Sequence, residues 1–385
     1  MRIAPSLSVL CVALLSACSM DSTGPKTSSI SSPNTASSDR SSRSVGQVFT
    51  MSNAAAGNSV LVFARGADGS LRASGTFATG GAGTGGGLGN QGGLSLDESG
   101  NTLVVVNAGS NEISAFRVNE GSSLELTDRI ASGGSMPISV TTSHGVVYVL
   151  NAGGTGNISG FHLDHGKLSA ISNSTRPLSG GAVGPAEISF DPSGQWLVVT
   201  EKNTNRLSTY AVGNDGVASG PTTTAASGVT PFGFAFTQSG TLIVSEAFGG
   251  APNGSAVSSY ANNGNGTWNT ITGSAPTTET SACWIAITQN GRFAYTTNAA
   301  SGTITGYAVN GGSLTRLNAD GVTANIGGTS SPTEMALSRN SQFLYAMSGG
   351  LHAIVAYAVS SDGSLTPIGG GANGLPGAAN GLAAR

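Results

Sequence analysis

The chain has 385 residues, of which 59 are glycine, while 9% are charged and 6% are aromatic. A formal net charge of −3 without a basic cluster argues against a nucleic-acid partner. Short β-branched segments alternate with glycine-rich turns, and helix-forming runs are almost missing, which favours an all-β protein over a helical or α/β one.

The first residues have the features of an export signal. Arg2 precedes a mostly apolar segment over 3–15, which is too short to span a bilayer as a helix. The segment ends in Leu15-Ser16-Ala17-Cys18, which resembles the bacterial lipobox, so we predict a lipoprotein signal peptide over 1–17 and lipidation of Cys18. An ordinary signal peptide is the alternative. Ser19, in place of an aspartate, favours the outer over the inner membrane of a two-membrane cell.

Residues 18–45 are predicted to form the lipidated cysteine and a flexible tether. The segment is rich in serine and threonine and has no hydrophobic periodicity, so burial cannot offset the entropy of ordering it. Contact with the membrane is therefore expected through the N-terminal lipid alone. The rest of the chain, 46–385, is predicted to be one domain.

From residue 46 onward one unit repeats: an apolar strand, a glycine turn, a second apolar strand that ends on a polar residue, a loop and a third strand. The polar residues that end the second strands recur every 44 to 54 positions and are Asn53, Asn107, Asn151, Glu201, Glu246, Asn298 and Ser348. Such a period, with four short strands in each unit, is typical of propeller blades. We predict a seven-bladed β-propeller with four-stranded antiparallel blades, with six or eight blades as alternatives.

The two ends of the domain are predicted to share a blade. The first unit begins at its second strand, 48–53, without a strand before it, and residues 380–384 resemble the start of an inner strand such as 333–337. The C-terminal strand should therefore complete the first blade, which leaves no open sheet edge.

The candidate functional residues gather on one face of this ring. In a propeller, the loops between second and third strands open on the same face as the starts of the inner strands, and the few charges of this chain are concentrated there. The predicted catalytic residues are Glu201, Lys202, Arg206 and Glu246. The predicted ligand-binding residues are Asn107, Asn151, Glu187, Phe232, Trp284, Asn298, Glu334 and His352.

Several of these residues have a structural alternative. A repeated asparagine at a strand end is usually a turn residue that bonds its own backbone. Glu201 and Glu246 replace that asparagine in two adjacent blades, which suggests either a local site or a salt bridge with Lys202 or Arg206. Trp284 either stacks on a ligand or fills the channel. The glycine-rich run 80–87 is interpreted as a flexible connection.

No cofactor and no structural metal site are expected, because the chain has no Cys-x-x-Cys motif and no cysteine–histidine cluster. Calcium stays open as an alternative, since a ring of glutamate and asparagine oxygens at a channel mouth suits a hard cation.

Three segments carry a family resemblance: DPSGQWLVVTEKNTNRLSTYAV at 191–212, QNGRFAYTTNAASGTITGYAV at 289–309 and SSDGSLTPI at 360–368. They resemble the seven-bladed propeller lactonases, a family that includes phosphogluconolactonases and carboxymuconate cyclases, and the similarity covers about 46–385. The resemblance implies histidine and arginine at inner-strand starts. This chain has proline there, in 137–138, 185–186 and 231–232, so those catalytic residues cannot be carried over. Instead it resembles a secreted branch of the family, marked by 200–202, 231–234, 245–247 and 282–284.

Two functions follow as hypotheses. The first is a monomeric binding module of the cell envelope that holds a small molecule, a carbohydrate or a protein at the channel mouth. The alternative is a lactone hydrolase or a muconate-type cycloisomerase, with Glu201 or Glu246 as the base, Lys202 or Arg206 as the cation and His352 as a weaker alternative base.

Overall fold

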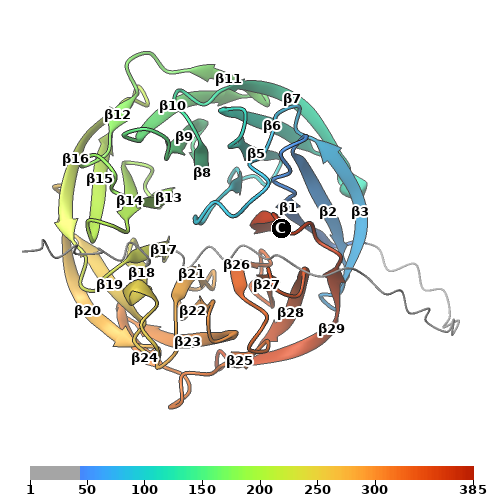
Figure 1. The fold of residues 1–385 in the computed structure, drawn as a ribbon, viewed down its shortest axis with the longest axis vertical. Coiled ribbons are helices and arrows are strands. Elements are labelled where there is room, and N and C mark those ends of the chain that lie inside the picture. The colour runs from blue at the N-terminus through green and yellow to red at the C-terminus, as the bar shows by residue number, and fades with distance from the viewer. Residues whose placement is uncertain (1–43) are drawn as a thin grey trace, which may run out of the picture.

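Seven antiparallel sheets surround a central axis in the computed structural model, which describes residues 44–385 (Figure 1). The all-β, seven-bladed prediction is confirmed, and the alternatives of six or eight blades are wrong. The predicted signal peptide, Cys18 and nearly all of the predicted tether lie outside the described residues. Within residues 44–385, no helix has the length and apolar character needed to cross a bilayer.

From the axis outward, the first three blades consist of the following strands. Blade 1 has β30 (Asn380–Ala384), β1 (Gly46–Met51), β2 (Ser59–Arg65) and β3 (Leu71–Ala78); blade 2 has β4 (Leu94–Leu96), β5 (Thr102–Asn107), β6 (Glu112–Val118) and β7 (Leu124–Ala131). Blade 3 has β8 (Pro137–Ser143), β9 (Val146–Asn151), β10 (Asn157–Asp164) and β11 (Lys167–Ala170), with β12 (Arg176–Pro177) also paired to β10.

The remaining blades repeat this order. Blade 4 has β13 (Pro185–Phe190), β14 (Trp196–Glu201), β15 (Arg206–Val212) and β16 (Ala218–Ala225); blade 5 has β17 (Pro231–Phe236), β18 (Leu242–Glu246), β19 (Ala256–Asn262) and β20 (Trp268–Pro276). Blade 6 has β21 (Ala282–Ile287), β22 (Phe293–Asn298), β23 (Thr303–Asn310) and β24 (Ser313–Arg316), with β25 (Ala324–Asn325) on β23; blade 7 has β26 (Pro332–Leu337), β27 (Phe343–Ser348), β28 (Ala353–Val359) and β29 (Leu365–Asn373). Two short 3₁₀ turns are η1 (Glu120–Ser122) and η2 (Phe248–Gly250).

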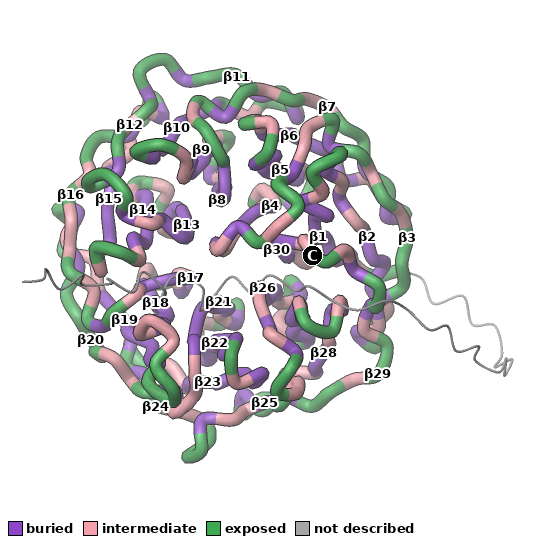
Figure 2. The backbone as a smooth tube through the Cα atoms, in the orientation of Figure 1, coloured by how far each residue is buried: buried purple, intermediate pink, exposed green. Residues whose placement is uncertain are grey.

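The core lies between the blades, because both faces of each sheet pack against neighbouring sheets. The second strands are almost entirely buried, whereas the outermost strands are mostly exposed or half-buried after a buried first residue (Figure 2). Buried tyrosines add polar links between blades, since the hydroxyls of Tyr148, Tyr295 and Tyr345 each donate to a glycine carbonyl of the next blade at 2.8 Å. The bond of Tyr345 reaches Gly69 and thus joins the last blade to the first.

The C-terminal strand completes blade 1, as predicted. β30 is antiparallel to β1, with Ala383 opposite Phe49 and Ala384 opposite Val48. Leu382 is buried in the apolar cluster that also contains Val48 and Phe343. The two ends of the domain are therefore held together by backbone pairing and by side-chain packing.

Replacement of Leu382 by alanine tests this closure. The truncation leaves a cavity where blades 7 and 1 meet, so we expect a loss of about 2–4 kcal/mol of unfolding free energy in urea titrations of the full chain. Leu351→Ala is the matched control, because Leu351 is 46% exposed and its loss should cost within about 0.5 kcal/mol. Equal effects of the two substitutions would contradict the closed ring.

Candidate functional site

The inner strands of six blades carry a register shift opposite the end of the second strand. These shifts lie at the starts of β8, β13, β17, β21, β26 and β30. A bulge leaves one residue unpaired and changes the direction of the neighbouring side chains. Four predicted ligand-binding residues lie at or beside these bulges: Glu187, Phe232, Trp284 and Glu334.

A segment of the chain itself, residues 88–93, reaches into the space between the inner strands (Figures 1 and 2), and we call it the axial plug. β4 has only three residues, whereas the other inner strands have five to seven, because the chain before β4 leaves the sheet and enters the channel. The side-chain nitrogen of Gln91 donates to the carbonyl of Ile285 at 3.0 Å, and its oxygen accepts from the backbone N–H of Ile285 at 2.9 Å. Its backbone N–H donates to Ala186 at 3.1 Å. Gln91, in the connection that leads into blade 2, is therefore hydrogen-bonded to blade 4 and to blade 6.

Asn90 anchors the plug to other blades. Its side-chain nitrogen donates to the carbonyl of Ile138, and its side-chain oxygen accepts from Asn380 at 2.8 Å. Its carbonyl accepts from the indole N–H of Trp284 at 2.8 Å. Because Trp284 is buried and bonded to the plug, its position favours the alternative in which it helps to fill the channel.

Sequence reasoning missed the plug, because the glycine-rich run before it was interpreted only as a flexible connection. The signal available was the long connection between Ala78 and Leu94, which ends in two amide side chains, Asn90 and Gln91, before an unusually short inner strand. Nothing in those residue types indicates that the connection turns into the channel.

Two buried carboxyl groups lie close to Gly92 in the plug. Glu334 accepts from the backbone N–H of Gly92 at 3.0 Å, and Glu187 accepts from that of Phe234 at 2.7 Å. Gly92 has a φ of +79°, and a Cβ there would lie 2.9 Å from the hydroxyl oxygen of Ser139 and 4.0 Å from Oε1 of Glu187. The plug therefore requires glycine at this position.

Burial dominates the acid–base behaviour of both groups, since it disfavours the ionised form. It raises the pKa of Glu334 to about 8, against the lowering effect of the N–H groups of Gly92 and Gly93. Burial also raises the pKa of Glu187 well above its usual range, and the nearby Glu334 adds to that rise. The inner strands within 44–385 carry no other aspartate, glutamate, lysine, arginine or histidine.

Beside the plug is a hollow of about 270 Å³, which we call the mouth hollow. Its wall contains residues from 152–156 and 202–203, which follow second strands, and residues 182–185, which lead into β13. Leu88, Met136 and Ile138 complete the wall. It therefore opens on the predicted face. Lys202 is its charged residue; Nζ donates to the carbonyl of Gly89 at 2.6 Å and lies 5.0 Å from the centre of the Phe232 ring.

Lys202 forms no salt bridge with a residue that the structure describes. Burial without a neighbouring carboxylate disfavours the ammonium form and lowers the pKa of Lys202 to about 8. The mouth hollow thus contains one cation whose charge is not neutralised by its surroundings.

The polar residues at the ends of the second strands share one hydrogen-bonding arrangement. Each of these residues is paired in the sheet with one residue of the third strand. In four blades its side chain is hydrogen-bonded to the hydroxyl group two positions after that paired residue. The four pairs are Asn107 with Ser114, Asn298 with Thr305, Glu201 with Ser208 and Glu246 with Ser258. Distances are 2.6 to 2.9 Å. Asn151 bonds instead to Asn157, its partner on β10, at 2.8 Å.

Glu201 and Glu246 are held inside their own blades. Glu201 also accepts from Thr204 and from Ser179, and Glu246 also accepts from Gly228 and Ser274. Neither forms the salt bridge with Lys202 or Arg206 that was the alternative. Burial raises the pKa of Glu246. These contacts suit a structural role, and a catalytic role for the two glutamates stays a prediction.

The other predicted basic residues lie apart from the mouth hollow. The guanidinium of exposed Arg206 donates to Thr223 at 2.9 Å. His352 lies before β28 with a left-handed φ of +51° and accepts from the N–H of Leu375 through its backbone carbonyl. Among residues 44–385, no three histidine, cysteine, aspartate or glutamate side chains are placed to hold a metal ion.

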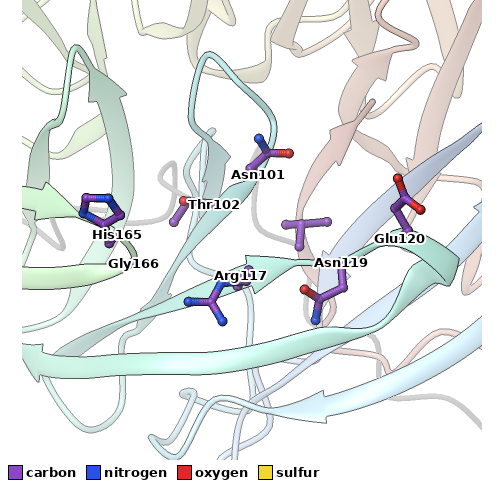
Figure 3. Close-up of a pocket in the computed structure, with 8 residues that line it drawn as sticks. Asn101, Thr102, Arg117, Asn119, Glu120, His165 and Gly166 are labelled. Atoms are coloured by element: carbon purple, nitrogen blue, oxygen red, sulfur yellow. The ribbon is translucent and has the colours of Figure 1, made fainter.

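A larger hollow, of about 460 Å³, lies at the opposite ends of the strands (Figure 3). It is lined by residues of the turns β4–β5, β6–β7 and β10–β11, among them Asn101, Arg117 and His165. Arg117 is paired with Glu125 at 2.6 Å and His165 with Asp164 at 2.5 Å. None of the predicted site residues lines it, and its two basic groups already have acidic partners.

Replacement of Glu201 by alanine tests the strand-end arrangement. It leaves the buried hydroxyl of Ser208, and the more exposed donors of Ser179 and Thr204, without their acceptor, so we expect a loss of about 1–3 kcal/mol of unfolding free energy in urea. Glu201→Gln should retain most of the stability, because its oxygen still accepts. Arg206→Ala, in the same blade but exposed, is the control and should stay within about 0.5 kcal/mol of the parent.

Solved structures with the same fold include two bacterial proteins. A putative 6-phosphogluconolactonase from Bacteroides fragilis superposes with a TM-score of 0.69 at 16% identity, over 91% of this chain and 100% of that one. A periplasmic gluconolactonase from Pseudomonas aeruginosa superposes with a TM-score of 0.64 at 17% identity, over 87% of this chain and 98% of that one. At these identities the likeness shows the fold alone. No curated protein matches the sequence.

A family model gives the closer assignment. The model described as "Lactonase, 7-bladed beta-propeller" matches residues 55–179, 157–248 and 284–372, which is most of the chain. The match includes the blades whose sequences carry the resemblance described above. This chain therefore belongs to the seven-bladed β-propeller lactonase family.

Proposed function

We propose that this protein binds a small ligand in the mouth hollow, with Lys202 as the charged contact, and that a lipid on Cys18 holds it at the cell envelope. The observation that carries the binding proposal is the position of Lys202, an unpaired cation in a hollow bounded by Leu88, Met136 and Ile138. Ligand sites in proteins are typically concave and mostly apolar, with a few polar groups that set orientation.

The dimensions and chemistry of the hollow favour a small molecule with an acceptor or anionic group. About 270 Å³ is near the lower end of the usual range for ligand sites. An ammonium group donates hydrogen bonds and accepts none, so it selects carboxylate, phosphate, carbonyl or hydroxyl oxygens. A carbohydrate or a protein loop that presents such an oxygen is the alternative occupant.

Lactone hydrolysis, or a related muconate-type cyclisation, is the second candidate. Family membership favours it, and Glu187 and Glu334 have the raised pKa values that suit proton transfer near neutral pH. The axial plug covers both carboxyl groups, however, so no substrate reaches them while it is in place. Binding is therefore the function that this closed arrangement supports better.

Replacement of Lys202 by methionine tests the binding site. We expect a sugar, sugar acid or lactone from a thermal-shift panel to raise the melting temperature of the parent, because a ligand that binds only the native state stabilises it. The shift should disappear in Lys202→Met and persist in Arg206→Met, which removes a cation outside the hollow. A ligand shift that survives Lys202→Met would contradict the placement. Steady acid release from the lactones, followed with a pH indicator, would favour the second candidate.

Replacement of Cys18 by serine tests the anchor. The parent chain, expressed in a bacterium with its signal, should partition into the detergent phase of Triton X-114, because acyl chains supply the apolar surface that anchors it. Cys18→Ser should partition into the aqueous phase. Cys11→Ser is the matched control and should behave like the parent. Aqueous partitioning of the parent would contradict lipidation while leaving the mouth-hollow proposal intact.

A further inference from the structure

The axial plug is held mainly by polar contacts. Its amide side chains, Asn90 and Gln91, bond to backbone carbonyls and to Asn380, and Leu88 is its single large apolar residue. Withdrawal of the plug would therefore remove one large apolar side chain, Leu88, from the core and uncover Trp284, while water can replace most of the hydrogen bonds that the plug loses. Segments with few apolar contacts belong to the low-stability end of a native protein.

The chain on the N-terminal side of the plug is suited to a hinge. Residues 80–87 contain glycine at all but two positions, and Gly80, Gly85 and Gly89 have φ values of +79°, +78° and +61°. Glycine adopts left-handed and right-handed backbone conformations with similar ease. Residues 82–86 are hydrogen-bonded to Asn53, Ala54 and Ser110, so the hinge consists of the glycines beyond them, Gly87 and Gly89, and its movement leaves β3 intact.

Two glutamates and one lysine lie next to the axial plug. Glu187 and Glu334 both lie close to Gly92, and neither forms a salt bridge with a described residue. The only other titrating amine or acid bonded to the plug is Lys202, through Gly89. Strands β4, β8, β17, β21 and β30 present no acidic group, basic group or histidine to this region. Backbone N–H groups of Gly92, Gly93 and Phe234 are therefore the donors that the described residues offer to the two carboxyl groups, and no described cation pairs with either of them.

We propose that the axial plug is a pH-controlled lid of the central channel, closed while Glu187 and Glu334 are neutral and released when both carboxyl groups ionise. Ionisation places two unpaired charges beside one another in a buried site, and the closed state cannot hydrate them. Withdrawal of residues 88–93 admits water to both carboxylates and removes the repulsion. The channel then opens to solutes from the same face as the mouth hollow.

The direction of the pH dependence follows from linkage. Both carboxyl groups have a pKa raised by burial in the closed state, so the closed state binds protons more strongly than the open one. Closure is therefore favoured at low pH and is lost as the pH rises through about 8, the value for Glu334. Lys202 loses its charge in the same range, so the carboxyl groups must be tested separately from it.

Amide hydrogen exchange of the full chain at pH 6 and pH 9 tests the proposal, after correction for the intrinsic rates. We expect the protection of peptides that cover 80–93 to fall at least about tenfold at the higher pH, since each ionising group changes the equilibrium up to about tenfold per pH unit. Peptides from the second strands, such as β14, should keep their protection. No loss of protection at 80–93, or an equal loss throughout the chain, would overturn the proposal.

The double variant Glu187→Gln/Glu334→Gln identifies the groups responsible. Glutamine keeps an oxygen that accepts from Gly92 and Phe234 but does not ionise, so the pH response at 80–93 should fall below about twofold. Glu246→Gln is the matched control, since Glu246 is also buried with a raised pKa but bonds within blade 5, and it should respond like the parent. If the double variant does not fold, each single variant should show a reduced response. A full response in the glutamine variants would assign the effect to Lys202 or another group and overturn the proposal.

Discussion

The structure depends on the closure of the ring between β30 and β1. A four-stranded sheet of this size cannot bury both of its faces alone, so each blade requires a neighbour on either side. The pairing of Phe49 with Ala383 supplies the missing inner strand of blade 1, and the hydrogen bond from Tyr345 to Gly69 joins blades 7 and 1. Arg385 then reaches Gly100 of blade 2 at 2.6 Å, so the last residue of the chain links its first two blades.

Closure of the ring leaves a central space between the inner strands, and the residues that occupy this space determine which side chains a ligand can reach. Seven inner strands start around one axis, with side chains redirected by bulges, and in this chain the space between them is taken by Asn90, Gln91 and Gly92. Gln91 satisfies a backbone donor and an acceptor of Ile285 on the far side of the axis. Lys202 lies beside this segment, where it borders the mouth hollow.

The acidic residues of the predicted face fall into two physically different groups. Glu201 and Glu246 accept from hydroxyls and backbone N–H groups of their own blades, so their carboxylates replace asparagine in a repeated bracing arrangement. Glu187 and Glu334 have far fewer donors and face the plug. Desolvation without compensation is what raises their pKa values, and that is the property expected of groups that can control a conformational change.

The sequence by itself determined the all-β class, the seven blades and the completion of blade 1 by 380–384, because those features follow from a repeating pattern and from two incomplete end units. It also located the face on which the unusual side chains gather. Only the tertiary structure decided which of them meet. Glu187 and Glu334 are distant in sequence yet lie close to one glycine, whereas Glu201 and Glu246 end equivalent strands yet bond within separate blades. The path of 88–93 could not be predicted either, since glycine allows many backbone directions. The partners of Asn90 and Gln91 come from blades 1, 3, 4, 5 and 6, which surround the axis only once the ring has closed.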